Sequence, residues 1–195
     1  MAKPSLAVAV LAAGASRRFG KADKLTAAFR GKRLGEHVCA EIPREHFEKQ
    51  WIITAARGHP CEPAWARMGF AVEVNPLAQE GMGTSVALAA RLALDARCSG
   101  LLVVLADTPL VPASHYAALA ARVVELGDHG MAVSCSGEAR TPPAAFGAAH
   151  LDRLARRTGD RGARAILNEG EIVFCPSDWL RDIDTPEELS RLERF

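Results

Sequence analysis

The chain has 195 residues, of which 49% are hydrophobic, and its formal net charge is +1. This length and composition suit a single domain over residues 1–195 with a substantial core, and they exclude a disordered protein. A charge so close to zero creates no overall field for nucleic acid or a membrane surface, and no apolar run approaches the roughly 18 residues of a membrane span. We therefore expect neither nucleic acid nor a membrane as a partner.

Five scattered cysteines without a Cys-x-x-Cys pair argue against a disulfide framework and against a structural zinc site. Lys3 and the apolar run that follows it are similar to a secretory signal, but that run is short. Cleavage there would also remove the most informative stretch of the chain. We expect a protein of the reducing cytoplasm.

Apolar runs alternate with amphipathic stretches along almost the whole chain. The runs predict strands at 6–12, 51–54, 71–75, 101–106, 131–135 and 171–175. Helical spacing predicts helices at 34–42, 64–68, 84–97, 113–126, 151–157, 160–169 and 186–195. Residues 137–143 contain no such pattern, and we expect a loose loop over the site. This order predicts a doubly wound α/β fold with a mostly parallel sheet, helices on both faces and 101–106 as a central strand.

A loop of small residues follows the first predicted strand. Such residues let a ligand approach the backbone N–H groups, and Arg17, Arg18, Lys21 and Lys24 add positive charge around the loop. Small residues with clustered cations suit a triphosphate, while the structural alternative is a tight turn with solvated cations. The loop contains neither Gly-Lys-Ser/Thr nor Gly-x-Gly-x-x-Gly, which argues against a Walker A loop and a dinucleotide fingerprint.

Acidic residues follow two later segments. Asp107 comes directly after the central strand, at the edge where ligands bind, and a carboxylate there suits Mg²⁺; the alternative is a turn aspartate. Asp182 and Asp184 lie on the same side of an extended segment and repel each other unless a cation or proton lies between them. A capped start of the last helix explains Thr185 but not these two aspartates.

A second glycine-containing loop, from Gly81 to Ser85, leads into the clearest predicted helix. Backbone N–H groups at a helix start bind anions or polar ligands, although Thr84 as a simple N-cap explains the pattern equally well. The six histidines show no metal-binding spacing, and we interpret them as surface or core residues.

Together these stretches resemble the MobA-like nucleotidyltransferases. Residues 11–20 with Lys24 are similar to the family signature Leu-Ala-Ala-Gly-x-Ser-x-Arg-x-Gly followed by Lys, and 182–189 to Asp-Ile-Asp-Thr-Pro-Glu-Asp-Leu. Asp107 stands in an Asp-Thr-Pro version of the family's Asp-Met-Pro, and Asn75 with residues 81–85 resembles a nucleotide-facing loop. Residues 159–164, with Pro143 and Phe146, resemble elements of the cytidylyltransferase branch. The Ala-Ala-Gly form of the loop is also closer to the molybdenum cofactor cytidylyltransferases than to the guanylyltransferases, which usually have Ala-Gly-Gly.

The resemblance implies a single-domain Rossmann-like nucleotidyltransferase fold and an attack by an acceptor phosphate on the α-phosphorus of an NTP, with release of pyrophosphate. It assigns catalysis to Arg18, Lys24 and Asp107, and Mg²⁺ to Asp107 with Asp184 or Asp182. It assigns nucleotide binding to Leu11, Ala12, Ala13, Gly14, Ala15, Ser16, Asn75, Gly81 and Ser85, and acceptor binding to Pro143, Phe146 and Arg164. In the cytidylyltransferase branch the substrates are CTP and the terminal phosphate of molybdopterin, and a molybdoenzyme that receives the product is a candidate partner.

Three alternatives stay open. The donor could be GTP, or the acceptor another phosphorylated molecule. The chain could instead be a non-catalytic protein that binds and delivers molybdenum cofactor, although four intact charged residues (Arg18, Lys24, Asp107 and Asp184) favour catalysis. An NAD-dependent oxidoreductase is the weakest alternative, because the dinucleotide fingerprint is absent.

Overall fold

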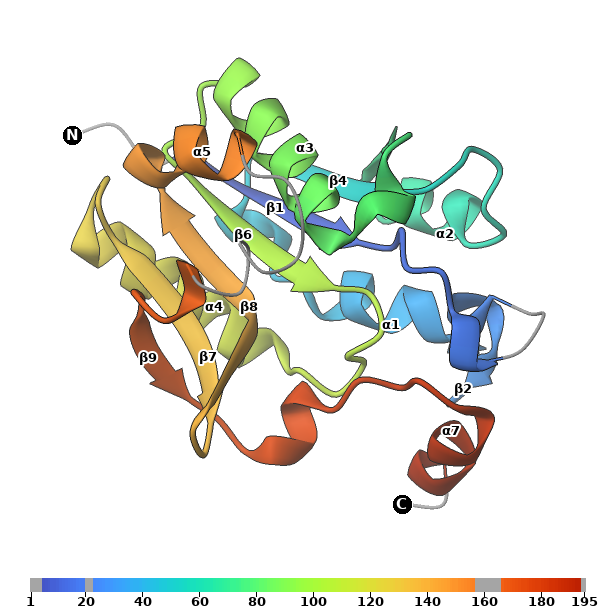
Figure 1. Ribbon diagram of the computed structural model, residues 1–195. Helices are drawn as coiled ribbons and strands as arrows, with labels where there is room; N and C mark the ends of the chain where they lie inside the picture. The colour runs from blue at the N-terminus through green and yellow to red at the C-terminus, as the bar shows by residue number, and fades with distance from the viewer. Residues whose placement is uncertain (1–4, 20–22, 157–165, 194–195) are drawn as a thin grey trace.

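The computed structural model describes residues 5–19, 23–156 and 166–193 and contains a seven-stranded sheet (Figure 1). Its strands are β1 (Leu6–Leu11), β4 (Lys49–Thr54), β5 (Ala71–Val74), β6 (Gly100–Leu105), β7 (Met131–Ser136), β8 (Ala139–Gly147) and β9 (Glu171–Phe174). Their order is β5-β4-β1-β6-β8-β7-β9, so β6 is the central strand, as expected. All neighbouring strands are parallel except β8, which is antiparallel to both β6 and β7.

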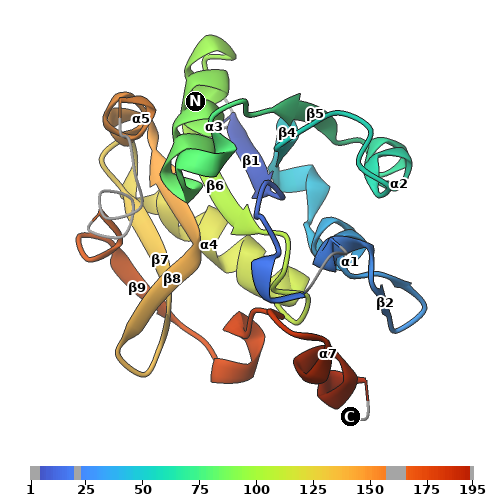
Figure 2. The same ribbon diagram turned by 45° about the vertical axis from the view of Figure 1, so that its right-hand side comes forward.

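Helices cover both faces of the sheet, as Figures 1 and 2 show. α1 (Leu34–Glu41), α2 (Glu62–Arg67) and α4 (Ala113–Leu126) pack on one face, while α3 (Met82–Asp95) and α5 (Ala148–Ala155) pack on the other. The side chains of β1 alternate between these two cores: Val8 and Val10 face the first, and Ala7 and Ala9 face the second. The expected α/β architecture with a mostly parallel sheet is therefore confirmed. Among the described residues, no helix is long and apolar enough to cross a membrane.

The expectation of a loop at residues 137–143 is wrong. These residues form the tight turn at Gly137, which has φ +60°, and the first half of β8. The pairing register shifts between Val133 and Ser134, so β7 and β8 form an irregular hairpin. Two adjacent prolines, Pro142 and Pro143, hide this strand from sequence analysis because proline cannot donate to a sheet ladder.

Smaller elements also depart from the sequence pattern. A hairpin of β2 (Ala28–Phe29) and β3 (Lys32–Arg33) was not expected. α3 begins at Met82 after its N-cap Gly81, two residues before the expected start. The expectation of Thr84 as N-cap is therefore wrong: Thr84 lies inside the helix, and its hydroxyl donates to the Gly81 carbonyl. Most of the helix expected at 160–169 lies outside the described residues.

The C-terminal segment crosses the carboxyl end of β6. It contains a 3₁₀-helix, η5 (Ser177–Leu180), and α7 (Pro186–Leu192). Thr185 is the N-cap of α7, as expected, and forms a capping box with Glu188. The Ile183 amide donates to the Asp107 carbonyl at 3.0 Å, while Leu189 and Leu192 pack in a small apolar cluster with Phe29 and Leu34. These contacts bring residues 182–184 to the end of the central strand.

Candidate active site

The loop after β1 borders a cavity of about 1420 Å³ over the carboxyl ends of the central strands. Residues 11–15 line one part of the cavity, and Gly81, Met82 and Ser85 at the start of α3 line another. Asp107, Asp182 and residues 140–142 of β8 also line the cavity. A second hollow of about 270 Å³ shares Gly14 and Ala15 with the cavity and also borders Ser16, Arg18, Lys24 and Asp184. The loop therefore faces both spaces.

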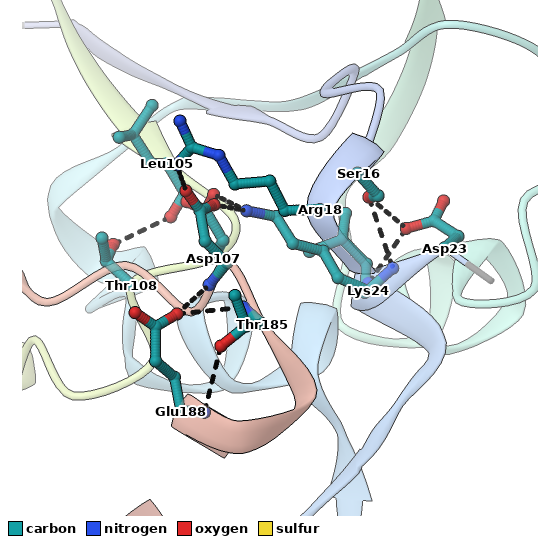
Figure 3. A network of polar contacts seen from close by, with 11 residues as sticks. Ser16, Arg18, Asp23, Lys24, Leu105, Asp107, Thr108, Thr185 and Glu188 are labelled. Atoms are coloured by element: carbon teal, nitrogen blue, oxygen red, sulfur yellow. Dashed lines mark hydrogen bonds and ion pairs between the residues drawn. The ribbon is translucent and has the colours of Figure 1, made fainter. Parts of the chain in front are cut away.

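Lys24 joins the two acidic segments. It begins the short 3₁₀-helix η2 (Lys24–Thr26), and its Nζ lies 2.6 Å from Asp107 Oδ2 and 2.7 Å from Asp184 Oδ1. The Lys24 side chain is only 9% exposed, so this double ion pair is shielded from solvent. Arg18 Nη1 lies 2.8 Å from the other oxygen of Asp184. Figure 3 shows this network, in which Lys24 from η2 meets Asp107, which follows β6.

The carboxylates determine the electrostatics of this network. Burial lowers the pKa of Lys24, but Asp107 and Asp184 outweigh it and raise the pKa, so the ammonium stays charged. The hydrogen bond from Lys24 lowers the pKa of Asp184. Burial raises the pKa of Asp182, and the charges of Asp184 and Asp107 raise it further.

These charges fit a divalent cation. Three carboxylates face two cationic side chains, Arg18 and Lys24, which leaves a surplus of one negative charge when Asp182 is ionised. Carboxylate oxygens are the ligands that Mg²⁺ prefers, and a bound cation would offset both the burial of the Asp182 carboxylate and its repulsion by Asp184 and Asp107. Within the described ranges, no group of three His, Cys, Asp or Glu side chains is already arranged around one metal position. In this structure the Lys24 ammonium and the Arg18 guanidinium together balance Asp107 and Asp184.

Asn75 holds the start of α3 in place. Its side chain is buried, and Nδ2 donates to the hydroxyls of Thr84 and Ser85, both at 2.9 Å. Its Oδ1 accepts from the Leu77 amide at 3.0 Å. Among the described residues, Gly81 and Ser85 line the cavity and Asn75 stands behind them. Nucleotide binding by these three residues stays a prediction.

The expected acceptor residues occupy different places. Phe146 borders the cavity but is 2% exposed and belongs to the core under α3 and α5. Pro143 is buried, and its carbonyl accepts from the Ser134 hydroxyl at 2.7 Å. The residues of β8 just before it, Arg140, Thr141 and Pro142, line the cavity instead. Arg164 lies outside the described residues.

Sequence analysis missed two residues beside the loop, Asp23 and His59. Asp23 Oδ2 lies 2.9 Å from His59 Nε2, and Asp23 Oδ1 accepts from the Leu25 amide at 2.9 Å. Asp23 directly precedes Lys24, which is a weak signal for a role in the site. His59 lies 36 residues further along, in a loop with no recognisable spacing, so the sequence contains no signal for it.

Comparisons with known proteins agree with this architecture. Residues 8–173 match the model of the MobA-like NTP transferase domain. The purine catabolism protein PucB of Bacillus subtilis (strain 168) is 31% identical over 212 aligned positions, which cover 100% of this chain and 98% of that protein. A nucleotidyl transferase from Methanothermobacter has a similar structure, with a TM-score of 0.79 at 18% identity, covering 97% of this chain and 96% of that one.

A third similar protein is the molybdopterin-guanine dinucleotide biosynthesis protein A of Archaeoglobus fulgidus. Its structure gives a TM-score of 0.70 at 21% identity and covers 96% of this chain and 97% of its own. At such identities the two solved structures establish a shared fold, while the family model and the 31% identical relative establish kinship. The chain belongs to the MobA-like NTP transferase family and, with it, to the nucleotidyltransferases.

Proposed function

We propose that this protein transfers CMP from CTP to the terminal phosphate of molybdopterin and releases pyrophosphate. The observation that carries the proposal is the buried Lys24 ammonium, held by Asp107 and Asp184 directly beside a small-residue loop. Nucleotidyl transfer depends mainly on holding the reactants in line and balancing phosphate charge, and a fixed cation beside the loop supports the second of these requirements.

Each part of the site has a role in this reaction. The backbone of residues 13–16, together with Arg18 and Lys24, holds the triphosphate in the smaller hollow. Asp107, with Asp184 or Asp182, would hold Mg²⁺, which when bound would neutralise charge on the phosphate oxygens. Because the pKa of Lys24 is raised, its ammonium is protonated at neutral pH and balances charge that develops as pyrophosphate leaves.

The size of the cavity supports a reaction between two substrates. Single small-molecule sites are about 300–1,000 Å³, and this cavity of about 1420 Å³ exceeds them. CTP would lie against the loop and the start of α3, and the acceptor would lie against β8. The methyl group of Ala13, on the cavity wall, narrows the space beside the loop, which favours a pyrimidine over a purine.

The names of two similar proteins bear on the choice of acceptor. The name of the Archaeoglobus protein associates this fold with molybdopterin dinucleotides, and the name of PucB associates a relative with purine catabolism. A molybdopterin acceptor, in the cytoplasm and with a molybdoenzyme receiving the product, combines the first association with the sequence resemblance. The runner-up is another phosphorylated acceptor.

Pyrophosphate release tests the proposal directly. The protein is incubated with Mg²⁺ and CTP, GTP, ATP or UTP, each with and without purified molybdenum cofactor. We expect release only with CTP and the cofactor together. Pyrophosphate release with GTP and cofactor, but not with the other three nucleotides, would identify a guanylyltransferase. Binding of the cofactor without pyrophosphate release from any nucleotide would favour a delivery protein.

A further inference from the structure

The imidazole of His59 has a fixed tautomer. The Cys61 amide donates to His59 Nδ1 at 3.1 Å, so Nδ1 is the acceptor nitrogen. The hydrogen of the neutral ring is then on Nε2, which donates to Asp23 Oδ2 at 2.9 Å. The ring also stacks on Trp65, with centroids 4.7 Å apart and an interplanar angle of 20°. Trp65 is fully buried, so His59 is fastened to the core of the protein.

Asp23 connects this histidine to the triphosphate loop. Its Oδ1 accepts from the Leu25 amide at 2.9 Å and thereby caps η2, the short helix that begins with Lys24. The same oxygen accepts from the Ser16 hydroxyl at 3.4 Å, and the Ser16 oxygen accepts from the Lys24 amide at 3.3 Å. Ser16 has φ +46°, a conformation that a serine adopts at a cost, so these bonds hold both the loop and the start of η2.

We propose that His59 is a positioning residue for the triphosphate site, because it orients Asp23 and so fixes Ser16 and Lys24 in the geometry that binds the phosphates. Among the described residues, His59 is not part of the lining of either hollow. Burial raises the pKa of Asp23, but the His59 bond and the Leu25 amide outweigh this and lower it, so the carboxylate stays ionised and keeps accepting. The inference rests on the proposed nucleotide binding at this loop, but not on the identity of the base or the acceptor.

Two substitutions separate positioning from packing. His59→Phe keeps a ring against Trp65 and removes both the Nε2–H donor to Asp23 and the Nδ1 acceptor of the Cys61 amide, while His59→Gln keeps a donor at nearly the position of Nε2. We expect His59→Phe to weaken MgCTP binding, measured by calorimetry, about ten- to a hundred-fold, because misplacing a binding group by about 1 Å has an effect of this size. We expect His59→Gln to recover most of that affinity.

A matched control is His37→Phe. The His37 Nε2 lies 2.8 Å from the Phe29 carbonyl, and its ring contacts the Phe29 ring edge-on, so this substitution likewise keeps a ring beside an aromatic side chain and removes hydrogen bonding by the imidazole. In the described part of the chain, His37 shares no hydrogen bond with Asp23 or the loop. We expect a similar loss of melting temperature in the two Phe variants, but an unchanged MgCTP affinity for His37→Phe.

A double-mutant cycle with Asp23→Asn tests the route. If His59 acts through Asp23, adding His59→Phe to Asp23→Asn should weaken MgCTP binding no further. Wild-type affinity in His59→Phe, failure of His59→Gln to recover it, or fully additive losses in the cycle would overturn the inference while leaving the proposed function intact. If the wild-type protein prefers GTP, the same variants are measured with MgGTP and the cytidylyl assignment alone fails. A wild-type protein that binds none of the four nucleotides would overturn both proposals.

Discussion

Asp107→Asn is the substitution that separates the chemistry of the site from its stability. The amide keeps the shape of the side chain and removes one of the two negative charges beside Lys24, whose Nζ stays 2.7 Å from Asp184. A hydrogen bond to a charged group contributes about 1.5–3 kcal/mol. Asp107 is 21% exposed and its charge also repels Asp182, so we expect a loss of about 1 kcal/mol, which for this size corresponds to about 2–4 °C in melting temperature.

The expected effect on turnover is much larger. A metal that neutralises phosphate charge lowers the activation barrier by several kcal/mol. Losing about 3–4 kcal/mol of this stabilisation slows the reaction about 10²–10³-fold. The assay is pyrophosphate release with CTP, cofactor and varied Mg²⁺, alongside thermal unfolding. Asp178→Asn is the matched control, because Asp178 is an exposed aspartate in η5 that pairs with Arg181 at 3.0 Å. Turnover of Asp107→Asn within about threefold of that control would refute a metal-binding or charge-balancing role for Asp107.

Three further substitutions test other parts of the site. A Cβ at Gly14 would meet no described atom within 4 Å, so the Gly14→Ala protein should unfold at the wild-type temperature. It should bind MgCTP about tenfold more weakly, because the added methyl group occupies the space of the phosphates. An affinity equal to that of the wild type, measured by calorimetry, would contradict this. Asp182 holds its proton more tightly in the folded chain, so the free energy of unfolding falls as pH rises from its ordinary pKa of 3.8 through the raised value. Asp182→Asn should remove this fall and raise the melting temperature at pH 7 in Mg²⁺-free buffer; a lower melting temperature would show that burial and repulsion do not destabilise the Asp182 carboxylate there. Finally, Ala13→Gly should reduce a CTP preference of about ten- to two-hundred-fold over GTP, and an unchanged ratio of affinities would show that the base is recognised elsewhere.

The parts of the fold that the sequence predicts are those in which local pattern and tertiary position agree. The apolar run at 101–106 is buried on both faces because β6 lies between two helical layers, and the buried β1 strand leads into the small-residue loop as expected. α4 begins and ends at the expected residues, Ala113 and Leu126. By contrast, β8 contains two adjacent prolines, and its strand conformation is imposed by β6 and β7 on either side.

In the candidate site, too, local patterns could be predicted from the sequence, whereas contacts between distant segments could not. The local pattern predicts Asp107 at the carboxyl end of a central strand and Asp182 and Asp184 in an acidic extended segment, but only the resemblance to the family brings these two segments together. That Lys24 bonds to both Asp107 and Asp184 could not be deduced, because it depends on how α7 packs against Phe29 and Leu34. His59 was invisible for a stronger reason: its role depends on a ring stacked on Trp65 and a bond to Asp23, and neither contact has a periodicity.

The acidic C-terminal segment follows every strand of the described sheet, so the last part of the chain to be synthesised completes the candidate site. All seven strands precede residue 182, so the sheet and the triphosphate loop leave the ribosome before Asp182 and Asp184. Lys24 and Asp107 both precede this segment, so the ion pair between them needs no residue of the C-terminal segment, whereas the ion pair of Lys24 with Asp184 does. The second carboxylate arrives when Ile183 docks on the Asp107 carbonyl and α7 closes over Phe29 and Leu34. A chain that ends before residue 182 would therefore contain every strand of the described sheet but lack Asp182 and Asp184, and its circular dichroism would not reveal that the site is incomplete.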